Sequence, residues 1–231
     1  MGQFNGIPLE KPLTRVRETA ELVKIMLAGE KTDYDGETVF SRGYRQAPME
    51  NAPQVYLAAL RPKMIEMAAE VGDGVIFNLW PKAALPKMME HVAIGAKAAG
   101  KDPAGVEIVN RAMVLCTDDK EYGRNLFRAA FGPYYATPVY NNFLAWAGYT
   151  EAAAQIAEGW AEKDRNKTAS AMSDEMIDEI AIIGNEDEIQ ARIQADADGG
   201  VDTHIIAPLA AKKEDVDRTF AAFTGTAFQF A

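Results

Sequence analysis

The chain has 231 residues, of which 48% are hydrophobic and 25% are charged, and its formal net charge is -10. This length fits one large domain or two small ones, and the composition is that of a soluble globular protein. The acidic balance disfavours a surface for nucleic acid or for an anionic membrane, since both require a basic face. It still allows a local basic pocket for one phosphate.

Cysteine use and the amino-terminal residues bear on location. Cys116 is the only cysteine, which excludes an internal disulfide or a thiolate metal cluster and fits a reducing, cytoplasmic location. Residues 1–30 lack the cationic start and apolar core of a secretory signal, and no apolar run is long enough to span a membrane. His91 and His204 are far apart and show no metal-binding spacing. We therefore expect a cytoplasmic protein with no metal site.

The first predicted element is a helix over residues 12–28. Its apolar residues recur at spacings of three and four, so they share one face. The proline and the glycine at its two ends suit the first turn and the stop of a helix. Residues 30–53 are irregular, with a tight turn at residues 35–36 and room for a short hairpin around residues 38–40.

A strand, a helix and a second strand follow. Residues 55–60 are apolar throughout, as expected of a strand covered on both faces. After a turn at residues 61–63 comes a helix with one apolar face, which ends at Gly72, and residues 75–77 form the next buried strand. This order is a βαβ unit, in which the strands are parallel and the crossover is right-handed.

The alternation of helices and strands continues to the end of the chain. Residues 133–182 interrupt it, and this segment is too long for a plain connection, so we interpret it as an inserted helical excursion. No repeat or linker divides the sequence, which predicts one α/β domain over residues 1–231 with four parallel strands. The remaining predicted elements are helices at 82–99, 120–131, 186–197 and 214–223 and strands at 106–116 and 203–209.

The turn after residue 60 is a candidate phosphate site. Ligands of parallel α/β folds bind at the carboxyl ends of strands, and the free N–H groups of a helix N-terminus favour an anion. Arg61 and Lys63 add positive charge there, and the small residues Ala58 and Ala59 allow close approach. The alternative is an ordinary turn with solvated basic residues. The glycine-rich phosphate motifs GxGxxG and GxxxxGK[ST] are both absent.

Other candidates follow from position in the predicted elements. Asn78 and Trp80 end the second strand, so they are candidates for a hydrogen bond to a ligand and for stacking on a ring; the alternative is a helix cap and a packed indole. His204 lies inside the last strand and points either into a barrel near its mouth or outward beneath a helix. His91 lies in the middle of a helix, where a partly buried or surface role is favoured.

The predicted excursion contains aromatic and acidic residues. Its tyrosines are candidates for a substrate lid, although aromatic residues at helix junctions are more often core. The carboxylates are interpreted as a solvated acidic face. Ser173 and Asn185 suit helix N-caps, and no side chain stands out as a general acid or base, so the catalytic residues are unknown. The residues in question are Tyr134, Tyr135 and Tyr140, and Asp174, Glu175, Asp178 and Glu179.

Four ordered blocks resemble one known family. Residues 53–78, PQVYLAALRPKMIEMAAEVGDGVIFN, resemble the luciferase-like monooxygenase superfamily and, within it, the coenzyme F420-dependent oxidoreductases. The resemblance extends over residues 5–223. The block from residue 5, NGIPLEKPLTRVRETAELVKIMLAGEKTDYDGETVF, resembles the family's helix and loop after the fourth barrel strand. AAGKDPAGVEIVNRAMVLCTDD from residue 98 resembles the entry to the seventh strand, and SDEMIDEIAIIGNEDEIQARIQADADGGVDTHIIAPL from residue 173 is similar to the run into the eighth.

The resemblance implies a TIM-type (β/α)₈ barrel, here a truncated barrel of about four parallel βα units plus the helical insertion. Relatives carry a further stretch before the equivalent of Asn5, which holds strands one to four and the family's catalytic residues where these exist. Three explanations stay open: a fragment of a longer gene product, strands supplied by a partner chain, or a shortened member of the family. A truncated version of a family enzyme is favoured.

The resemblance also implies a cofactor, coenzyme F420 or alternatively FMN. In the family the turn after the fifth strand approaches the cofactor phosphate, and many relatives have glycine where this chain has Arg61. The implied activity is hydride transfer to or from a small organic substrate; with FMN it would be oxygenation, and a non-catalytic flavin-binding protein is the third alternative. Relatives often dimerise, so self-association is expected. The matching turn consists of Ala58, Ala59, Leu60, Arg61, Lys63 and Met64.

Overall fold

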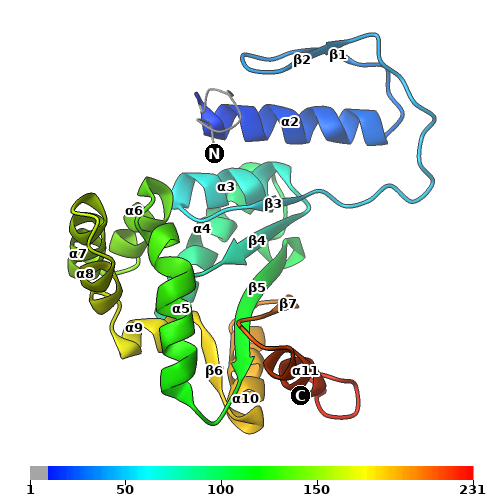
Figure 1. Cartoon of the computed structure of the whole chain (residues 1–231). Coiled ribbons are helices and arrows are strands. Elements are labelled where there is room, and N and C mark those ends of the chain that lie inside the picture. The colour runs from blue at the N-terminus through cyan, green and yellow to red at the C-terminus, as the bar shows by residue number, and fades with distance from the viewer. Residues whose placement is uncertain (1–9, 231) are drawn as a thin grey trace. The chain divides into compact units, whose positions relative to one another are not determined.

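The computed structural model describes residues 10–230, and the part of the resembling block at residues 5–9 lies outside them. The chain forms two compact units, which are described in turn; Figure 1 labels their elements. Unit 1 comprises residues up to 75 together with residues 90–107. Unit 2 comprises residues 76–89 and residues from 108 onward.

The first described element of unit 1 is helix α2 (Pro12–Leu27), as the sequence predicted. The helix packs beside α3 (Pro62–Val71); Arg17 pairs with Glu70 of α3, and Lys24 pairs with Asp73 just beyond its end. Gly29 follows α2 with φ +74°, and a Cβ there would lie 2.6 Å from the backbone of Pro48. Only glycine fits both this conformation and this close approach.

A hairpin of β1 (Asp33–Asp35) and β2 (Phe40–Arg42) is tied to α2 by one buried carboxylate. Glu18 accepts hydrogen bonds from the backbone N–H groups of Glu37 at 2.6 Å and Thr38 at 2.8 Å, and from the Thr38 hydroxyl at 2.5 Å. These bonds, led by the one from the Thr38 hydroxyl, lower the pKa of Glu18 to about 2. The hairpin turn is therefore held by charge-assisted hydrogen bonds rather than by apolar packing.

The rest of unit 1 is the predicted βα start. Strand β3 (Tyr56–Ala58) pairs with β4 (Gly74–Asn78), whose first two residues belong to this unit. Helix α4 (Leu85–Ala98) enters the unit at Glu90 and packs closely on α3, since a Cβ on Gly95 would lie 2.0 Å from a backbone oxygen of α3. A short 3₁₀ turn, η2 (Pro103–Gly105), precedes the next strand.

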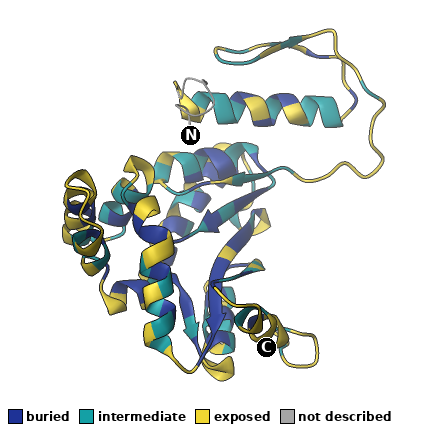
Figure 2. Ribbon diagram, in the orientation of Figure 1, coloured by how far each residue is buried: buried dark blue, intermediate teal, exposed yellow. Residues whose placement is uncertain are grey.

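In unit 2 the central strand is β5 (Glu107–Cys116), which continues into this unit from residue 108. It is parallel to β7 (Thr203–Pro208), in a register that runs from Val109 opposite Thr203 to Val114 opposite Pro208. It is also parallel to the short strand β6 (Ile182–Gly184), which meets its last three residues, and β4 is a further neighbour. In Figure 2, β5 is coloured as buried along most of its length.

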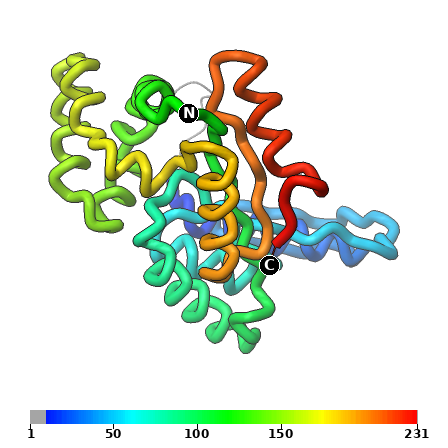
Figure 3. The backbone as a smooth tube through the Cα atoms, turned by 90° about the horizontal axis from the view of Figure 1, so that it is seen from below, coloured from blue at the N-terminus to red at the C-terminus, as the bar shows by residue number. Residues whose placement is uncertain are grey.

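The two faces of β5 contact different helices. Met113 and Leu115 pack with residues of α5, α7 and α9, whereas Val114 and Cys116 pack with residues of α10 and α11. Helices α7 and α8 lie side by side in both views (Figures 1 and 3). The remaining elements are η1 (Lys82–Ala84), α5 (Lys120–Tyr135), α6 (Pro138–Trp146), α7 (Thr150–Ala161), α8 (Arg165–Ser170), α9 (Asp174–Ile180), α10 (Glu186–Asp198) and α11 (Lys213–Ala221).

The predicted α/β class with a parallel sheet is confirmed, and each predicted strand is present. The structure adds β6, which the sequence prediction missed because its three residues stand directly between two helices. Helix α5 runs on to Tyr135 instead of ending at Phe131, although it contains Pro133. The interval predicted as an excursion is largely helical. None of the helices in residues 10–230 is long and apolar enough to cross a membrane.

Candidate functional site

The turn after β3, in unit 1, presents the N-terminus of α3. Arg61 is the N-cap, and no side chain caps this end of the helix. The N–H groups of Met64 and Ile65 both bond to the Arg61 carbonyl at 2.9 Å, while the N–H of Lys63 has no partner within the helix. The Arg61 side chain is exposed and forms no ion pair with any residue between 10 and 230. An uncapped N-terminus beside an unneutralised guanidinium suits one phosphate group.

The other residues predicted for this turn differ in their surroundings. Lys63 is exposed but forms an ion pair at 2.7 Å with Glu66, whose pKa is lowered first by this lysine and also by His91. Arg61 is therefore the freer of the two charges. Ala58 is exposed, Ala59 is buried, and Leu60 and Met64 are intermediate. The small, open residue at the end of β3 leaves room for a ligand to approach the backbone.

In unit 2, Asn78 and Trp80 diverge at the end of β4. Leu79 between them adopts the left-handed conformation, with φ 53°. Trp80 is buried, and its Nε1 donates to Oδ1 of Asn110 at 3.0 Å. Asn78 is half-buried, and its Nδ2 donates to the hydroxyl of Tyr140 at 3.1 Å. The structure therefore gives the indole an internal partner and leaves the amide near the surface.

The left-handed residue is held by a buried hydroxyl. Tyr135 is fully buried, and its O–H donates to the carbonyl of Leu79 at 2.9 Å. Burial raises the pKa of Tyr135 well above its usual value, so this hydroxyl stays protonated and keeps the proton that it donates to Leu79. A non-glycine residue at positive φ persists only where its surroundings fix it, and such positions concentrate at functional sites.

His204, on β7, belongs to the other face of the sheet from Asn78. It stands opposite Asn110 in the register, so it shares the face on which Trp80 meets Asn110. Its ring lies 5.8 Å from that of Phe230, and burial lowers its pKa. Both ring nitrogens are buried without a hydrogen-bond partner among the residues that the structure describes. The three residues predicted for one pocket therefore lie on two faces.

A small enclosed space lies on the Asn110 face. Asp196 contributes an almost fully buried carboxylate, of which Oδ1 accepts from Arg192 Nε at 3.0 Å and Oδ2 has no partner in the described residues. The space measures about 10 Å³, which is close to the size needed by one water molecule and far below that of an organic cofactor. The residues lining it are Leu79, Trp80, Asn110, Arg111, Ala112, Ile180, Ile182, Arg192 and Asp196.

On the Asn78 face the structure adds a residue that sequence reasoning missed. Arg111, in the middle of β5, places Nη1 3.3 Å from Oδ1 of Asn78 and 3.2 Å from the sulfur of Met113. Together with Tyr140 it forms a polar chain at the level of the carboxyl end of β4. The signal in the sequence was a single charge within the otherwise neutral run IVNRAMVLC. We call Arg111, Asn78 and Tyr140 the Arg111 cluster.

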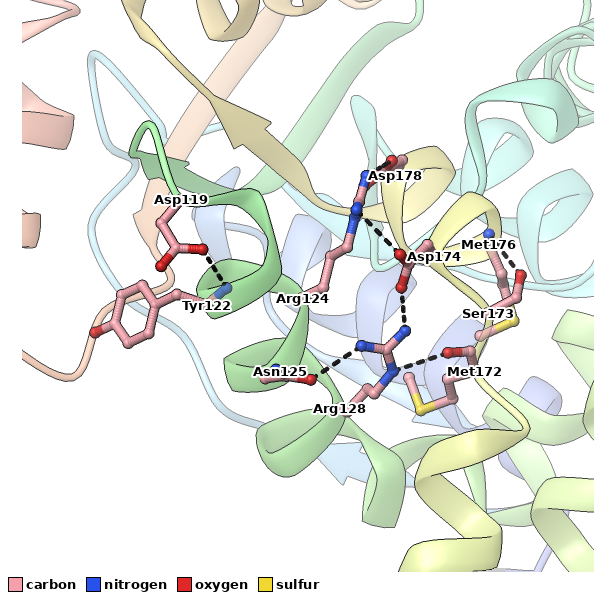
Figure 4. A network of polar contacts seen from close by, with 10 residues as sticks. All are labelled: Asp119, Tyr122, Arg124, Asn125, Arg128, Met172, Ser173, Asp174, Met176 and Asp178. Carbon is pink, nitrogen blue, oxygen red and sulfur yellow. Dashed lines mark hydrogen bonds and ion pairs between the residues drawn. The ribbon is translucent and has the colours of Figure 1, made fainter.

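The acidic residues of α9 face two arginines of α5 (Figure 4). Arg124 bonds Asp178 through Nε at 2.9 Å and Nη2 at 2.5 Å, and it bonds Asp174 at 3.0 Å. Arg128 pairs with Asp174 and donates to the Met172 carbonyl at 2.9 Å. Asp174, Glu175 and Asp178 are exposed, as the predicted solvated acidic face requires, and the structure adds that Asp174 and Asp178 are ion-paired. We call Arg124, Arg128, Asp174 and Asp178 the α5–α9 network.

The predicted caps are also present: Ser173 accepts from the N–H of Met176 at 3.2 Å, and Asn185 forms a capping box with Glu188. Cys116 is buried, as expected of a small apolar residue. His91, in unit 1, is half-buried, and its Nδ1 lies 2.9 Å from Glu66. Neither the cysteine nor this histidine belongs to the Arg111 cluster. No group of acidic, histidine or cysteine side chains in residues 10–230 is arranged to hold a metal ion.

The parallel sheet, the βα turns and the site at strand ends define the α/β class whose ligands bind at the carboxyl edge. Residues 1–203 match the luciferase-like monooxygenase family, so the chain belongs to that family. The resemblance drawn from the sequence is confirmed.

Two relatives within the family are reductases. The chain is 29% identical over 206 residues to a 5,10-methylenetetrahydromethanopterin reductase of Archaeoglobus fulgidus, which covers 87% of this chain and 62% of the relative. The corresponding reductase of Methanolobus tindarius is 32% identical over 213 residues, covering 90% and 65%. The chain thus spans less than two thirds of the length of these relatives.

Solved structures support the fold. The coenzyme F420-dependent tetrahydromethanopterin reductase from Methanopyrus kandleri superimposes with a TM-score of 0.73 at 22% identity, covering 92% of this chain and 64% of that one. An FMN complex of a type II Baeyer-Villiger monooxygenase from Pseudomonas putida gives 0.59 at 16% identity, covering 93% and 63%. The expected barrel-family architecture is therefore found in enzymes described with either cofactor.

Proposed function

We propose that this chain forms part of a coenzyme F420-dependent oxidoreductase that transfers a hydride to or from a small organic substrate. The observation that carries the proposal is the unpaired Arg61 guanidinium beside the uncapped N-terminus of α3. The names of the relatives, which are 29–32% identical, favour F420 and a reductase activity. FMN is the second candidate, because the monooxygenase from Pseudomonas putida was described with FMN.

In this proposal the protein binds and orients, and the deazaflavin supplies the hydride chemistry. Arg61 and the N–H of Lys63 hold the cofactor phosphate, while exposed Ala58 allows the backbone to come close. Ala59, Leu60 and Met64 shape the same turn. Asn78 remains the predicted polar group of the substrate or cofactor pocket. Trp80 and His204 also stay predictions for that pocket, with Trp80 acting through its bond to Asn110 and not by stacking.

Self-association and a cytoplasmic location complete the proposal. Strand β7 pairs with β5 and has no second partner in the described residues, and such an open edge favours association between chains. The single cysteine fits a reducing compartment. Sedimentation at several protein concentrations tests the association.

The test is a titration of the purified chain with oxidised F420, followed by the intrinsic fluorescence of the deazaflavin. Arg61→Gln is expected to weaken binding about 10- to 100-fold, since a hydrogen bond to a charged group contributes roughly 1.5–3 kcal/mol. Arg165→Gln removes the same charge from an exposed helix start in unit 2 and is expected to leave binding unchanged.

A parallel titration with FMN separates the two cofactors. Binding of FMN in preference to F420 would replace the proposal with the monooxygenase alternative. Failure of the folded chain to bind either would refute it. If F420 binds, methylenetetrahydromethanopterin, which the relatives' names specify, is the first substrate to assay. Binding without turnover would support the non-catalytic alternative.

A further inference from the structure

The position of Arg111 is unusual for a charged residue. It lies in the middle of β5, between buried Asn110 and Ala112, and this strand has partners along both edges. Arginine usually lies where water surrounds its head group, not at the centre of a sheet face. Here the side chain is exposed on that face, level with the end of β4, where parallel α/β proteins bind ligands.

Arg111 has only neutral partners. Nη1 contacts an amide oxygen and a thioether sulfur, and Nε and Nη2 have no hydrogen bond among residues 10–230. Arg124, Arg128, Arg192 and Arg218 in the same unit each pair with a carboxylate. The charge of Arg111 is thus left unneutralised, and the two nitrogens that form the flat edge of the guanidinium are open to a ligand.

The orientation of this guanidinium is fixed by contacts on its Nη1 side, away from the open edge. The hydroxyl of Tyr140 accepts from Nδ2 of Asn78, which turns the amide oxygen of Asn78 towards Arg111. The Tyr140 ring is itself held edge-on by Tyr134 and Tyr135, each with its ring centroid 5.9 Å away. The cluster therefore presents one cation with little freedom to reorient.

The surroundings of the charge are apolar. Ile205 stands opposite Arg111 in the β5–β7 register, shares its face, and is 47% exposed. Met113 flanks the guanidinium on the same face. A single positive charge matches a monoanion, and the planar fork of arginine matches the two oxygens of a carboxylate. An apolar neighbourhood suits the hydrocarbon part of such an anion.

From this arrangement we infer that the Arg111 cluster is a binding site for the carboxylate of a small organic anion, with the apolar part of the ligand against Ile205. Arg111 binds the carboxylate through Nε and Nη2. Asn78 is a positioning residue that holds the guanidinium. As the substrate site of the enzyme, this assignment rests on the proposed function; as a carboxylate site, it stands on the cluster alone.

The experiment uses benzoate as the probe and benzamide as its uncharged isostere. Binding to the whole chain is followed by the ¹H–¹⁵N signal of the Arg111 Nε–H group and by calorimetric titration. Benzoate is expected to shift that signal and benzamide is not. Arg111→Gln should raise the Kd for benzoate at least tenfold, whereas Arg165→Gln, the matched loss of an exposed arginine, should change it less than twofold.

Two more conservative variants, at Arg111 and at Tyr140, test the assigned roles. Arg111→Lys keeps the charge but loses the fork, so an intermediate Kd is expected. Tyr140→Phe should weaken benzoate binding severalfold and broaden the Arg111 Nε–H signal, because Asn78 is then no longer oriented. Equal binding by the arginine and lysine forms would overturn the bidentate geometry. These variants also keep the test decisive if Arg111→Gln does not fold.

The outcomes separate this inference from the proposed function. Benzoate binding that depends on Arg111, in a chain that binds neither F420 nor FMN, would sustain the carboxylate site and remove its role as a substrate site. If the chain binds F420 but Arg111→Gln does not change benzoate binding, the proposed function stands and the carboxylate site is refuted. An Arg111 that responds to inorganic phosphate but not benzoate, or whose loss changes only the oligomeric mass, would refute the carboxylate assignment.

Discussion

Two groups of arginine residues in unit 2 use the same side chain in opposite ways. In the α5–α9 network, Arg124 bonds Asp178 through two nitrogens, and Arg124 and Arg128 each bond Asp174 through one (Figure 4). In the Arg111 cluster the guanidinium meets an amide oxygen and a sulfur, and no carboxylate. The first arrangement is complete within the protein, whereas the second leaves donors for something else.

The comparison separates stability from binding. The arginines of the network are 19–20% exposed and their partners close the gap between two helices, so their loss should be felt in folding. Arg111 is more exposed and satisfies no buried acceptor that would otherwise be orphaned. Its loss should leave folding nearly unchanged and alter only what the protein binds. Three changes to the chain test this division.

The largest effect is expected from Tyr135→Phe, because Tyr135 connects the two regions. Tyr135 lies on α5 with the network arginines, and its hydroxyl supports Leu79 beside Asn78. Its removal leaves a buried carbonyl without a partner next to a left-handed residue, which should cost about 1–3 kcal/mol of unfolding free energy. Urea denaturation measures this cost.

The same variant should also weaken benzoate binding, because Asn78 follows the conformation of Leu79. Tyr134→Phe is the matched control, since Tyr134 is 49% exposed and should lose less than about 0.5 kcal/mol. A Tyr135→Phe protein as stable as the wild type would show that the hydroxyl does not hold the left-handed turn.

A smaller effect is expected from Arg128→Gln. The change removes an ion pair and a hydrogen bond to the Met172 carbonyl, but Asp174 is half exposed, so solvent screening limits the loss to about 1 kcal/mol. Arg111→Gln, measured in the same denaturation series, should lose less than about 0.5 kcal/mol. Equal losses for the two variants would contradict the division between a structural and a ligand-binding arginine.

The sequence predicted the order of elements well, because helix and strand periodicities and end signals are local. Ser173 and Asn185, for example, cap α9 and α10 as their residue types suggested. It missed β6, since three residues between helices show no period of their own and pair only through contact with the distant end of β5. Local signals do not contain that partner.

The candidate site was predicted only in part. Asn78 was placed correctly at the end of a strand. Leu79, however, adopts a left-handed conformation after which Trp80 lies in the core, and no sequence motif predicts such a conformation at a leucine. Tyr140 was considered either as lid or core, and its bond to Asn78 spans 62 positions of sequence. Arg111 was missed although it is a lone charge in a predicted strand, because its lack of a carboxylate partner is visible only in the folded chain.

The smallest expected effect concerns acid stability. Hydrogen bonding to Arg128 holds the pKa of Asp174 below its usual 3.8. As pH falls, the unfolded chain takes up this proton first, so the stability that the pair contributes is present above about pH 4 and is lost as pH falls through the lower, folded-state pKa. Asp174→Asn removes that contribution. In urea denaturation, the difference in unfolding free energy between wild type and this variant should stay constant from about pH 7 to pH 5 and shrink towards pH 3.

Arg111→Gln should leave the loss of stability at acid pH unchanged, because no carboxylate in the described residues pairs with it. A change in that loss caused by Arg111→Gln would mean that an acidic group meets this arginine after all, and the contrast between the two regions would fail.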